Sequence, residues 1–125
     1  MIVAIGIDLV EISRIEQAFA RRGDRFRRRV FTESESSYCE GRASKFASYA
    51  ARFAAKEAAM KAIGTGWAEA VGWKEIEVVS APNGKPTLQL HGRALEFMLQ
   101  LGASKAHISL THSGDLAIAQ VILET

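Results

Sequence analysis

The strongest helical pattern of hydrophobic positions begins near residue 44 and ends near Ile63. Four of its apolar residues recur at intervals of 4, 3 and 7 positions, which places them on one face of an α-helix; they are Phe46, Ala50, Phe53 and Met60. Position 57 belongs to the same face, yet it holds a glutamate. A carboxylate on an apolar face is costly to bury unless a metal, a base or a hydrogen-bond network neutralises it. The pattern therefore predicts a long central helix whose Glu57 meets such a partner.

A second pattern, at the start of the chain, alternates with a period of two. Branched residues from Ile2 to Val10 predict a buried strand, and the alternation places Ala4, Gly6 and Asp8 on the same face. Aspartate is a poor strand residue, so Asp8 either ends the strand and caps the next helix or has a chemical role. The small residues Ala4 and Gly6 leave space beside its carboxylate.

The rest of the chain has the patterns of short helices and paired strands. Thr32 to Glu35 matches the capping box of a helix start, and the segment from Pro82 to Pro86 is a strong turn signal. The order β-α-α-α-β-β-α-β-β predicts one α+β domain over residues 1–125, with a mostly antiparallel sheet packed on the long central helix. Beyond the first strand and the central helix, the expected elements are a helix from about Glu11, a helix to about Cys39, strands at 75–80 and 87–91, a helix at 92–101, and a hairpin of 106–111 with 116–123.

Composition limits the class of protein. A chain of 125 residues that is 48% hydrophobic and 24% charged has enough apolar residues for one folded core. No apolar run approaches the roughly 20 residues that cross a bilayer, and the apolar start contains Asp8, so we expect neither a membrane segment nor a signal peptide. The single cysteine, Cys39, excludes an internal disulfide and a Cys-x-x-Cys site, which fits a reducing cytoplasm.

Positive charge is concentrated in one segment, although the net charge is only +2. Residues 21–29 contain six arginines in nine positions, and four arginines would form a basic stripe if the helix continued through Gly23; they are Arg14, Arg21, Arg25 and Arg28. A solvated helix face is the ordinary explanation of such a run. Arginine, however, binds carboxylates and phosphates through two parallel hydrogen bonds, which favours an anionic partner.

Common catalytic signatures are missing from the sequence. There is no phosphate-binding loop of the GxxxxGK[ST] type, and His91, His107 and His112 are not spaced as a zinc set. What remains is a pair of carboxylates, Asp8 and Glu57, on apolar surfaces of different elements. Two carboxylates suit a hard ion such as Mg²⁺, which usually also binds substrate phosphate. Lys61, one helical turn after Glu57, would suit the phosphate oxygens, so the residues predict Mg²⁺-dependent phosphoryl-type transfer.

Several blocks of the sequence resemble the small-subunit class of 4′-phosphopantetheinyl transferases, the holo-acyl-carrier-protein synthases. The blocks stand in the order of that family and extend along the whole chain; they are residues 5–12, 52–58 with Lys61 and Ala62, 64–66, 83–86 and 109–113. The resemblance implies the family fold. It also implies that coenzyme A donates its phosphopantetheine arm to a serine of apo-acyl carrier protein, with release of adenosine 3′,5′-bisphosphate, in support of fatty acid synthesis.

The resemblance assigns roles to individual residues. Asp8 and Glu57 match the Mg²⁺ ligands of the family, and Lys61 matches its active-site lysine. The proton acceptor for the serine stays open among a metal-bound water, Glu57 and neutral Lys61. The resemblance implies coenzyme A contacts for Arg52, Lys61, Gly64, Asn83, Gly84, Lys85, Pro86 and His112. It implies carrier-protein contacts for the stripe Arg14, Arg21, Arg25 and Arg28, because acyl carrier proteins are acidic helical bundles.

The family resemblance also implies a homotrimer whose active sites are shared between subunits, and no nucleic-acid partner. One position departs from larger two-repeat relatives, which carry a second acidic residue where this chain has Val10. Glu11 is expected on the opposite strand face, so two protein ligands and water would complete the metal shell. Two alternative functions remain at this stage, a basic nucleic-acid-binding module and a different Mg²⁺-dependent phosphate-transfer enzyme.

Overall fold

The elements follow the predicted order closely. This computed structural model describes residues 1–64 and 71–125, so Thr65 and Gly66 of the expected glycine-rich stop lie outside the described residues. The elements are β1 (Ile2–Glu11), α1 (Ile12–Arg22), α2 (Asp24–Val30), α3 (Glu33–Glu40), α4 (Lys45–Ile63), the 3₁₀ turn η1 (Trp73–Glu75), β2 (Ile76–Ser80), β3 (Pro86–Leu90), α5 (Gly92–Gln100), β4 (Lys105–Ser113) and β5 (Leu116–Glu124). Helix α4 ends where expected, at Gly64, whose left-handed backbone (φ 81°) suits glycine.

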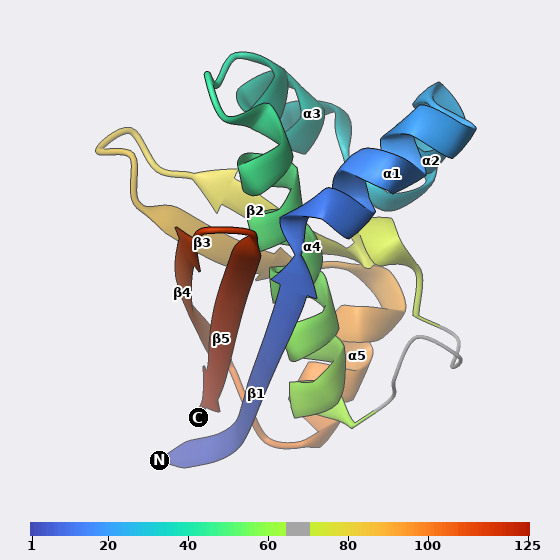
Figure 1. Cartoon of the computed structure of the whole chain (residues 1–125). Helices are drawn as coiled ribbons and strands as arrows, with labels where there is room; N and C mark the ends of the chain where they lie inside the picture. Colours follow the sequence, from blue (N-terminus) through green and yellow to red (C-terminus); the bar gives the residue numbers. More distant parts are fainter. Residues whose placement is uncertain (65–70) are drawn as a thin grey trace.

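The strands form two antiparallel sheets rather than the single sheet expected. One sheet has the order β1-β5-β4, and the other is the β2-β3 hairpin. Helix α4 crosses the inner face of the first sheet, and α1 with α2 projects to the side of α4 away from the hairpin tip (Figure 1). The predicted α+β class is confirmed, with α4 as its central helix.

Strand β1 lies unusually close to α4. Its inner face carries Ala4, Gly6 and Asp8, as the alternation predicts, and Gly6 is fully covered. A Cβ atom at Gly6 would overlap the carbonyl oxygen of Ala58 in α4. The two backbones therefore meet without a side chain between them, because strand and helix both carry small residues at the contact.

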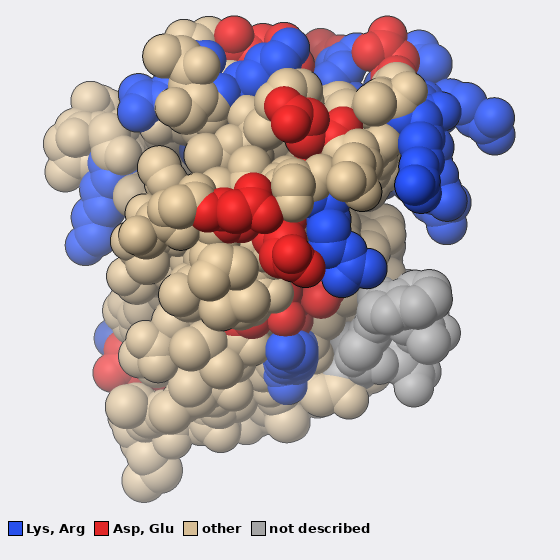
Figure 2. Space-filling model, in the orientation of Figure 1, with Lys and Arg blue, Asp and Glu red and all other residues tan. Residues whose placement is uncertain are grey.

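The outer face of the same strand is apolar and exposed. Ile5, Ile7 and Leu9 each expose more than half of their surface, and Val3 exposes 38%. Figure 2 shows the uncharged surface of this region below the basic side chains that gather over α1 and α2. A contiguous apolar surface on a strand indicates contact with another molecule.

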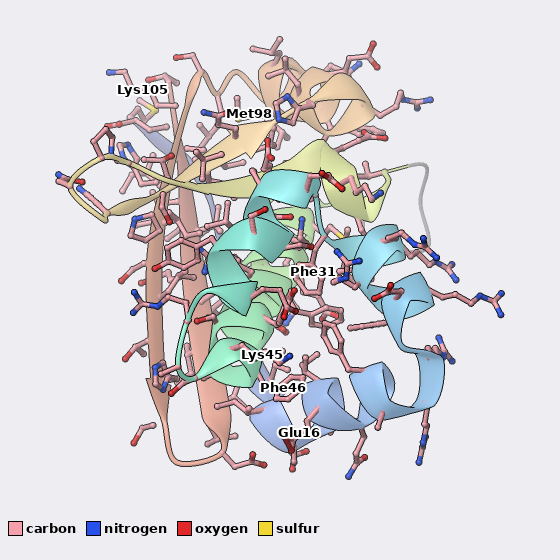
Figure 3. The ribbon with its side chains drawn as sticks, turned by 90° about the horizontal axis from the view of Figure 1, so that it is seen from above. Glu16, Phe31, Lys45, Phe46, Met98 and Lys105 are labelled. Atoms are coloured by element: carbon pink, nitrogen blue, oxygen red, sulfur yellow. The ribbon has the colours of Figure 1, made fainter. Side chains whose placement is uncertain are left out.

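A second cluster of the core is aromatic and joins α1, α2 and α4. Phe19 lies with its ring centroid 5.5 Å from that of Phe46 and 4.6 Å from that of Tyr49. Phe31, which follows α2, is also buried, with its centroid 4.8 Å from Tyr49. Figure 3 shows Phe31 and Phe46 directed into the space between these helices. The cluster holds the arginine-rich helices against α4.

The fully buried charge of α4 is Lys56, not Glu57. The Lys56 ammonium lies 2.8 Å from Glu35 of α3, and neither side chain is exposed to solvent. Lys56 also donates to the backbone oxygens of Trp73 and Ile76, while Glu35 accepts from the backbone N–H of Val78 at 2.8 Å. Burial lowers the pKa of Lys56, against the opposing effect of the Glu35 charge. This pair joins α3, α4 and the start of β2.

The capping box of α3 serves the same buried network. Thr32 accepts a hydrogen bond from the Glu35 N–H, and the Glu35 carboxylate accepts one from the Thr32 N–H at 2.9 Å. The sequence pattern at Thr32 and Glu35 therefore predicted the helix start correctly. The same pattern did not predict that Glu35 also pairs with Lys56.

The hydrogen bonds of Glu77 on β2 are expected to make the stability of the protein depend on pH. Burial disfavours its charge, but hydrogen bonds from Thr32, Ser34 and His91 outweigh burial and hold the pKa of Glu77 below its ordinary value. A carboxyl whose pKa is lowered by folding stabilises the protein at neutral pH, and this contribution is lost as the pH falls through the lowered pKa. We expect Glu77→Gln to destabilise the protein at pH 7 and to have less effect below about pH 4.

Urea unfolding across this pH range measures the effect. Glu96→Gln, at an exposed position of α5, is the control and should change stability little at any pH. A destabilisation by Glu77→Gln that is the same at pH 7 and pH 4 would contradict the expectation.

Candidate active site

A cavity of about 560 Å³ opens between β1, α1 and α4. Asp8 from β1 and Glu57 from α4 both line it, together with Arg14 from α1. Phe26 and Phe53 form part of its apolar wall. The backbone contact of β1 with α4 thus brings together the two carboxylates that sequence analysis selected.

Asp8 is mostly enclosed and only partly satisfied. Its Oδ1 accepts a hydrogen bond from the Lys61 ammonium at 2.9 Å, and the same ammonium donates to the Ile7 carbonyl oxygen at 3.0 Å. The Oδ2 atom of Asp8 is buried and has no hydrogen-bond partner among the described residues. A buried carboxylate oxygen without a partner is unfavourable, so this atom is a candidate ligand for a cation.

The charges of the site are coupled. Burial raises the pKa of Glu57, and the nearby negative charge of Asp8 raises it further. The hydrogen bond to Asp8 raises the pKa of Lys61, which favours the ammonium form that binds phosphate. A carboxyl group whose ionisation is opposed by a second carboxylate nearby, as that of Glu57 is by Asp8, is an arrangement that a divalent cation neutralises.

The expectation that two protein carboxylates hold a metal stays a prediction. Within residues 1–64 and 71–125 no group of three or more potential metal-binding side chains was found. Glu11, expected on the opposite face of the strand, lines the same cavity at the end of β1. Glu11 is exposed like the outer residues Ile7 and Leu9 of β1, which agrees with that expectation, and Leu9 lines the cavity as well.

Apart from Lys61 of α4 and Gly64 at the end of that helix, the predicted coenzyme A residues lie away from the carboxylate cavity. Arg52 is buried, donates to the Ser80 hydroxyl at 3.2 Å and stacks on Tyr38. Its Nε atom has no hydrogen-bond partner in the part of the chain that the structure describes. The predicted turn Asn83–Pro86 follows Ser80 at the exposed hairpin tip, where Gly84 has a φ of 85°. Arg52 therefore neighbours the end of β2 where this turn begins, but neither Arg52 nor the turn lines the cavity of Asp8 and Glu57.

His112 lines a different hollow, between the end of β4 and the start of α4. Arg42, Ser44 and Ser48 line it with His112. Sequence analysis missed Arg42, Ser44 and Ser48, because only the folded chain brings the loop before α4 beside the end of β4. This hollow and the carboxylate cavity share no residue.

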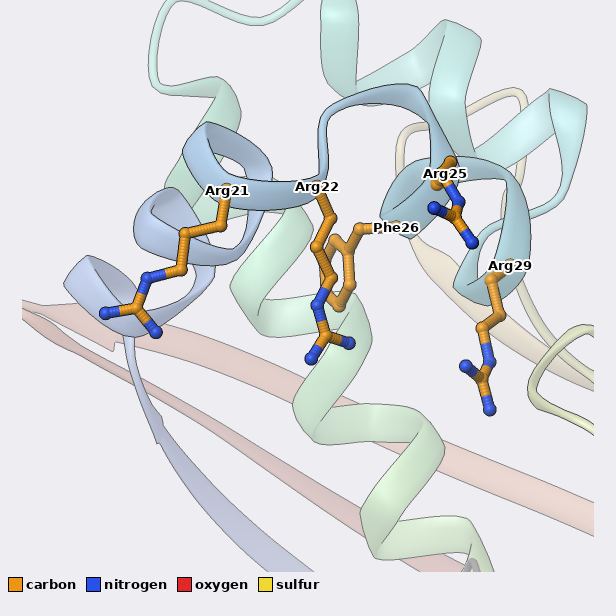
Figure 4. A pocket seen from close by; sticks show the side chains of 5 residues that line it. All are labelled: Arg21, Arg22, Arg25, Phe26 and Arg29. Carbon is orange, nitrogen blue, oxygen red and sulfur yellow. The ribbon is translucent and has the colours of Figure 1, made fainter.

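The arginines do not form the continuous stripe that an unbroken helix through Gly23 would give. Gly23, with a φ of 55°, separates α1 from α2, which changes the helical phase. Four arginines and one phenylalanine of α1 and α2 line a groove instead, and Arg28 is not among them. Asp24 also interrupts the positive charge, because it pairs with Arg27 at 3.3 Å. Figure 4 shows the residues that line the groove, which are Arg21, Arg22, Arg25, Phe26 and Arg29.

The arginine groove and the carboxylate cavity share one lining residue. Phe26 lines both of them, so the arginine groove and the cavity of Asp8 and Glu57 are neighbours. Sequence analysis missed Arg22 and Arg29, whose positions depend on the break at Gly23. The adjacent arginines and the apolar ring suit an acidic partner with apolar side chains.

Comparison with known proteins identifies the family. The sequence pattern of the 4′-phosphopantetheinyl transferase superfamily matches residues 4–121. The chain belongs to this superfamily. Membership agrees with the resemblance of the sequence blocks, and it does not favour the two alternative functions.

Relatives in the superfamily share both sequence and fold. The chain is 51% identical over 124 residues to the holo-[acyl-carrier-protein] synthase of Solibacter usitatus, covering 99% of each chain. The solved holo-[acyl-carrier-protein] synthase of Neisseria meningitidis is 33% identical with a TM-score of 0.87, and each chain is covered completely. The Helicobacter pylori synthase, solved in complex with coenzyme A, is 31% identical with a TM-score of 0.82, covering 96% of this chain and 99% of that one.

Proposed function

We propose that this protein transfers the 4′-phosphopantetheine group of coenzyme A to a serine of apo-acyl carrier protein. The observation that carries the proposal is the pair Asp8 and Glu57, with an unpartnered buried carboxylate oxygen and Lys61 beside it, in a member of this superfamily. Relatives are named holo-[acyl-carrier-protein] synthases, after the product of the reaction. The Helicobacter pylori relative was solved in complex with coenzyme A. Transfer releases adenosine 3′,5′-bisphosphate and would support fatty acid synthesis.

Asp8 and Glu57 are the residues that would hold Mg²⁺. When bound, Mg²⁺ would neutralise the pyrophosphate and make the phosphorus more electrophilic. Lys61 would release Asp8 in that state and turn its ammonium to a phosphate oxygen, since 56% of its side chain is exposed and free to move. Gly64 ends the same helix at the chain position where the family brings coenzyme A close to the backbone.

The carrier protein would bind across the arginine groove. Arg14 lines the cavity with the two carboxylates, and Arg21 and Arg25 line the groove beside it. An acidic helix placed along these side chains would direct its serine toward Asp8 and Glu57. Arg28 lies outside the groove and is a weaker candidate than Arg22 and Arg29.

The nucleotide end of coenzyme A requires a second copy of the chain. The residues proposed to bind the nucleotide lie outside the carboxylate cavity; they are Arg52, the turn of residues 83–86 and His112. Within one chain, the proposed nucleotide site is therefore separate from the proposed metal site. The exposed outer face of β1 would bring subunits together. A homotrimer with shared sites accounts for both observations. The transferase activity would take place in the cytoplasm, where the buried thiol of Cys39 stays reduced.

Disruption of the exposed apolar face tests the trimer. We expect Ile7→Glu to dissociate the assembly and to abolish transfer, because a charge would be buried at the subunit contact. Sedimentation velocity and the transfer rate measure the two effects, with Thr125→Glu at the exposed end of the chain as the control. A monomeric wild-type protein with full activity would contradict the assembly.

Mass spectrometry of apo-acyl carrier protein tests the function itself. The protein is incubated with coenzyme A, Mg²⁺ and an apo-carrier, and the carrier should gain the mass of one phosphopantetheine group. Chelation of the metal should stop the reaction. No mass shift with several carriers would contradict the proposal and favour another phosphate-transfer reaction.

A further inference from the structure

Helix α1 has no N-terminal cap from its own segment. Glu11 stands at the N-cap position but makes no side-chain hydrogen bond to the helix, and the first turn contains no acidic residue. A helix start leaves backbone N–H groups without partners, and an unpaired start frays. The helix that carries Arg14 and Arg21 therefore needs an external partner at this end.

That partner is Asp115, in the turn between β4 and β5, about a hundred residues away along the chain. The Asp115 backbone oxygen accepts from the Ile12 N–H at 2.7 Å. Its Oδ1 accepts from the Ser13 N–H at 2.9 Å, and its Oδ2 accepts from the Ser13 hydroxyl at 2.7 Å. Asp115 thus accepts two backbone N–H groups and one hydroxyl of the first turn, and it supplies the negative charge that suits a helix start.

The position of this contact gives it a consequence for the site. Arg14 follows Ser13 directly and lines the cavity of Asp8 and Glu57. On the other side, His112 of β4 and Gly114 of the β4–β5 turn line a hollow together with Ile12. Asp115 therefore ties the first turn of α1 to the turn that follows His112.

We propose that Asp115 is a positioning residue for the carrier-binding helix. By capping α1 from the β4–β5 turn, it fixes where the helix starts and how Arg14 and Arg21 are directed at an acidic partner. In this role Asp115 acts through α1 and not by contact with a substrate. The inference rests on the proposed carrier surface, so its test must separate the two.

Steady-state kinetics with each substrate varied in turn provide the test. We expect Asp115→Ala to raise KM for apo-carrier protein about fivefold, the size expected for losing a helix cap. The KM for coenzyme A and kcat at saturating carrier should stay within twofold of the wild type. Asp115→Asn keeps the acceptor for the Ser13 N–H without the charge, and it should restore KM for the carrier to near the wild-type value. Ser13→Ala, which removes only the hydroxyl contact, should have a smaller effect than Asp115→Ala.

The outcomes separate a positioning role from a general structural one. An Asp115→Ala variant that melts at a lower temperature with unchanged KM for the carrier overturns the inference. Equal increases in KM for both substrates overturn it as well. Arg21→Glu is measured alongside as the reference for the carrier surface. If Arg21→Glu leaves KM for the carrier unchanged, the carrier surface itself is wrong; if Arg21→Glu raises it and Asp115→Ala does not, only the role of Asp115 fails.

Discussion

Replacement of Glu57 by glutamine is expected to lower the rate of phosphopantetheine transfer by about 100-fold or more. Glutamine keeps the size of the side chain but removes the charge that would hold Mg²⁺ opposite Asp8. Charge stabilisation by a metal contributes several kcal/mol to the transition state, and each 1.4 kcal/mol corresponds to about tenfold in rate. The rate is measured with apo-carrier protein and coenzyme A at saturating Mg²⁺.

Two measurements keep this expectation separate from a loss of folding. Mg²⁺ should raise the melting temperature of the wild type and have a smaller effect on Glu57→Gln. An ion that binds only the native state stabilises that state. Glu96→Gln, on the exposed side of α5, should match the wild type in both assays. A Glu57→Gln variant that keeps more than a tenth of the activity would exclude Glu57 as an essential ligand.

The largest effect on stability is expected at Lys56. Replacing Lys56 by methionine leaves the Glu35 carboxylate buried without its cation, although the volume of the side chain is nearly kept. Loss of one partner of a buried ion pair costs about 3–5 kcal/mol of unfolding free energy. The loss is measured by urea unfolding at pH 7.

Two further variants test the cause. The exposed pair of Lys45 with Glu40 offers a matched control, and Lys45→Met should cost less than about 1 kcal/mol. The double variant Lys56→Met with Glu35→Gln should recover part of the loss, because no uncompensated charge stays buried. A Lys56→Met variant within about 1 kcal/mol of the wild type would mean that water or a pKa change relieves Glu35.

These two neighbours, Lys56 and Glu57, show where prediction from the sequence reached its limit. The length and end of α4 were predictable because its apolar periodicity is long and Gly64 stops it. Its orientation was not, since α4 is buried on most of its circumference and carries alanine on several sides. Successive residues of a helix differ by about 100° in direction, so the pattern could not decide which charged residue faces the interior.

The candidate site was predictable in part, where the periodicity of a single strand or helix decides which residues share a face. The alternation of β1 placed Asp8 on the inner face, and the one-turn spacing placed Lys61 near Glu57. The groove arginines Arg22 and Arg29 were missed because a single glycine, Gly23, resets the helical phase. The separation of Arg52 and His112 from the carboxylates depends on tertiary structure alone, and their roles in binding coenzyme A stay predictions.

The main-chain contact at Gly6 has a consequence for protein engineering. The spacing of Asp8 and Glu57 is set by two backbones that touch, not by the side chains that fill the interior around them. Apolar residues elsewhere in the core can therefore be exchanged for others of similar volume without retuning the distance between the carboxylates. Redesign for thermal tolerance has room in the aromatic cluster around Tyr49, provided that Gly6 and the alanines facing it are kept.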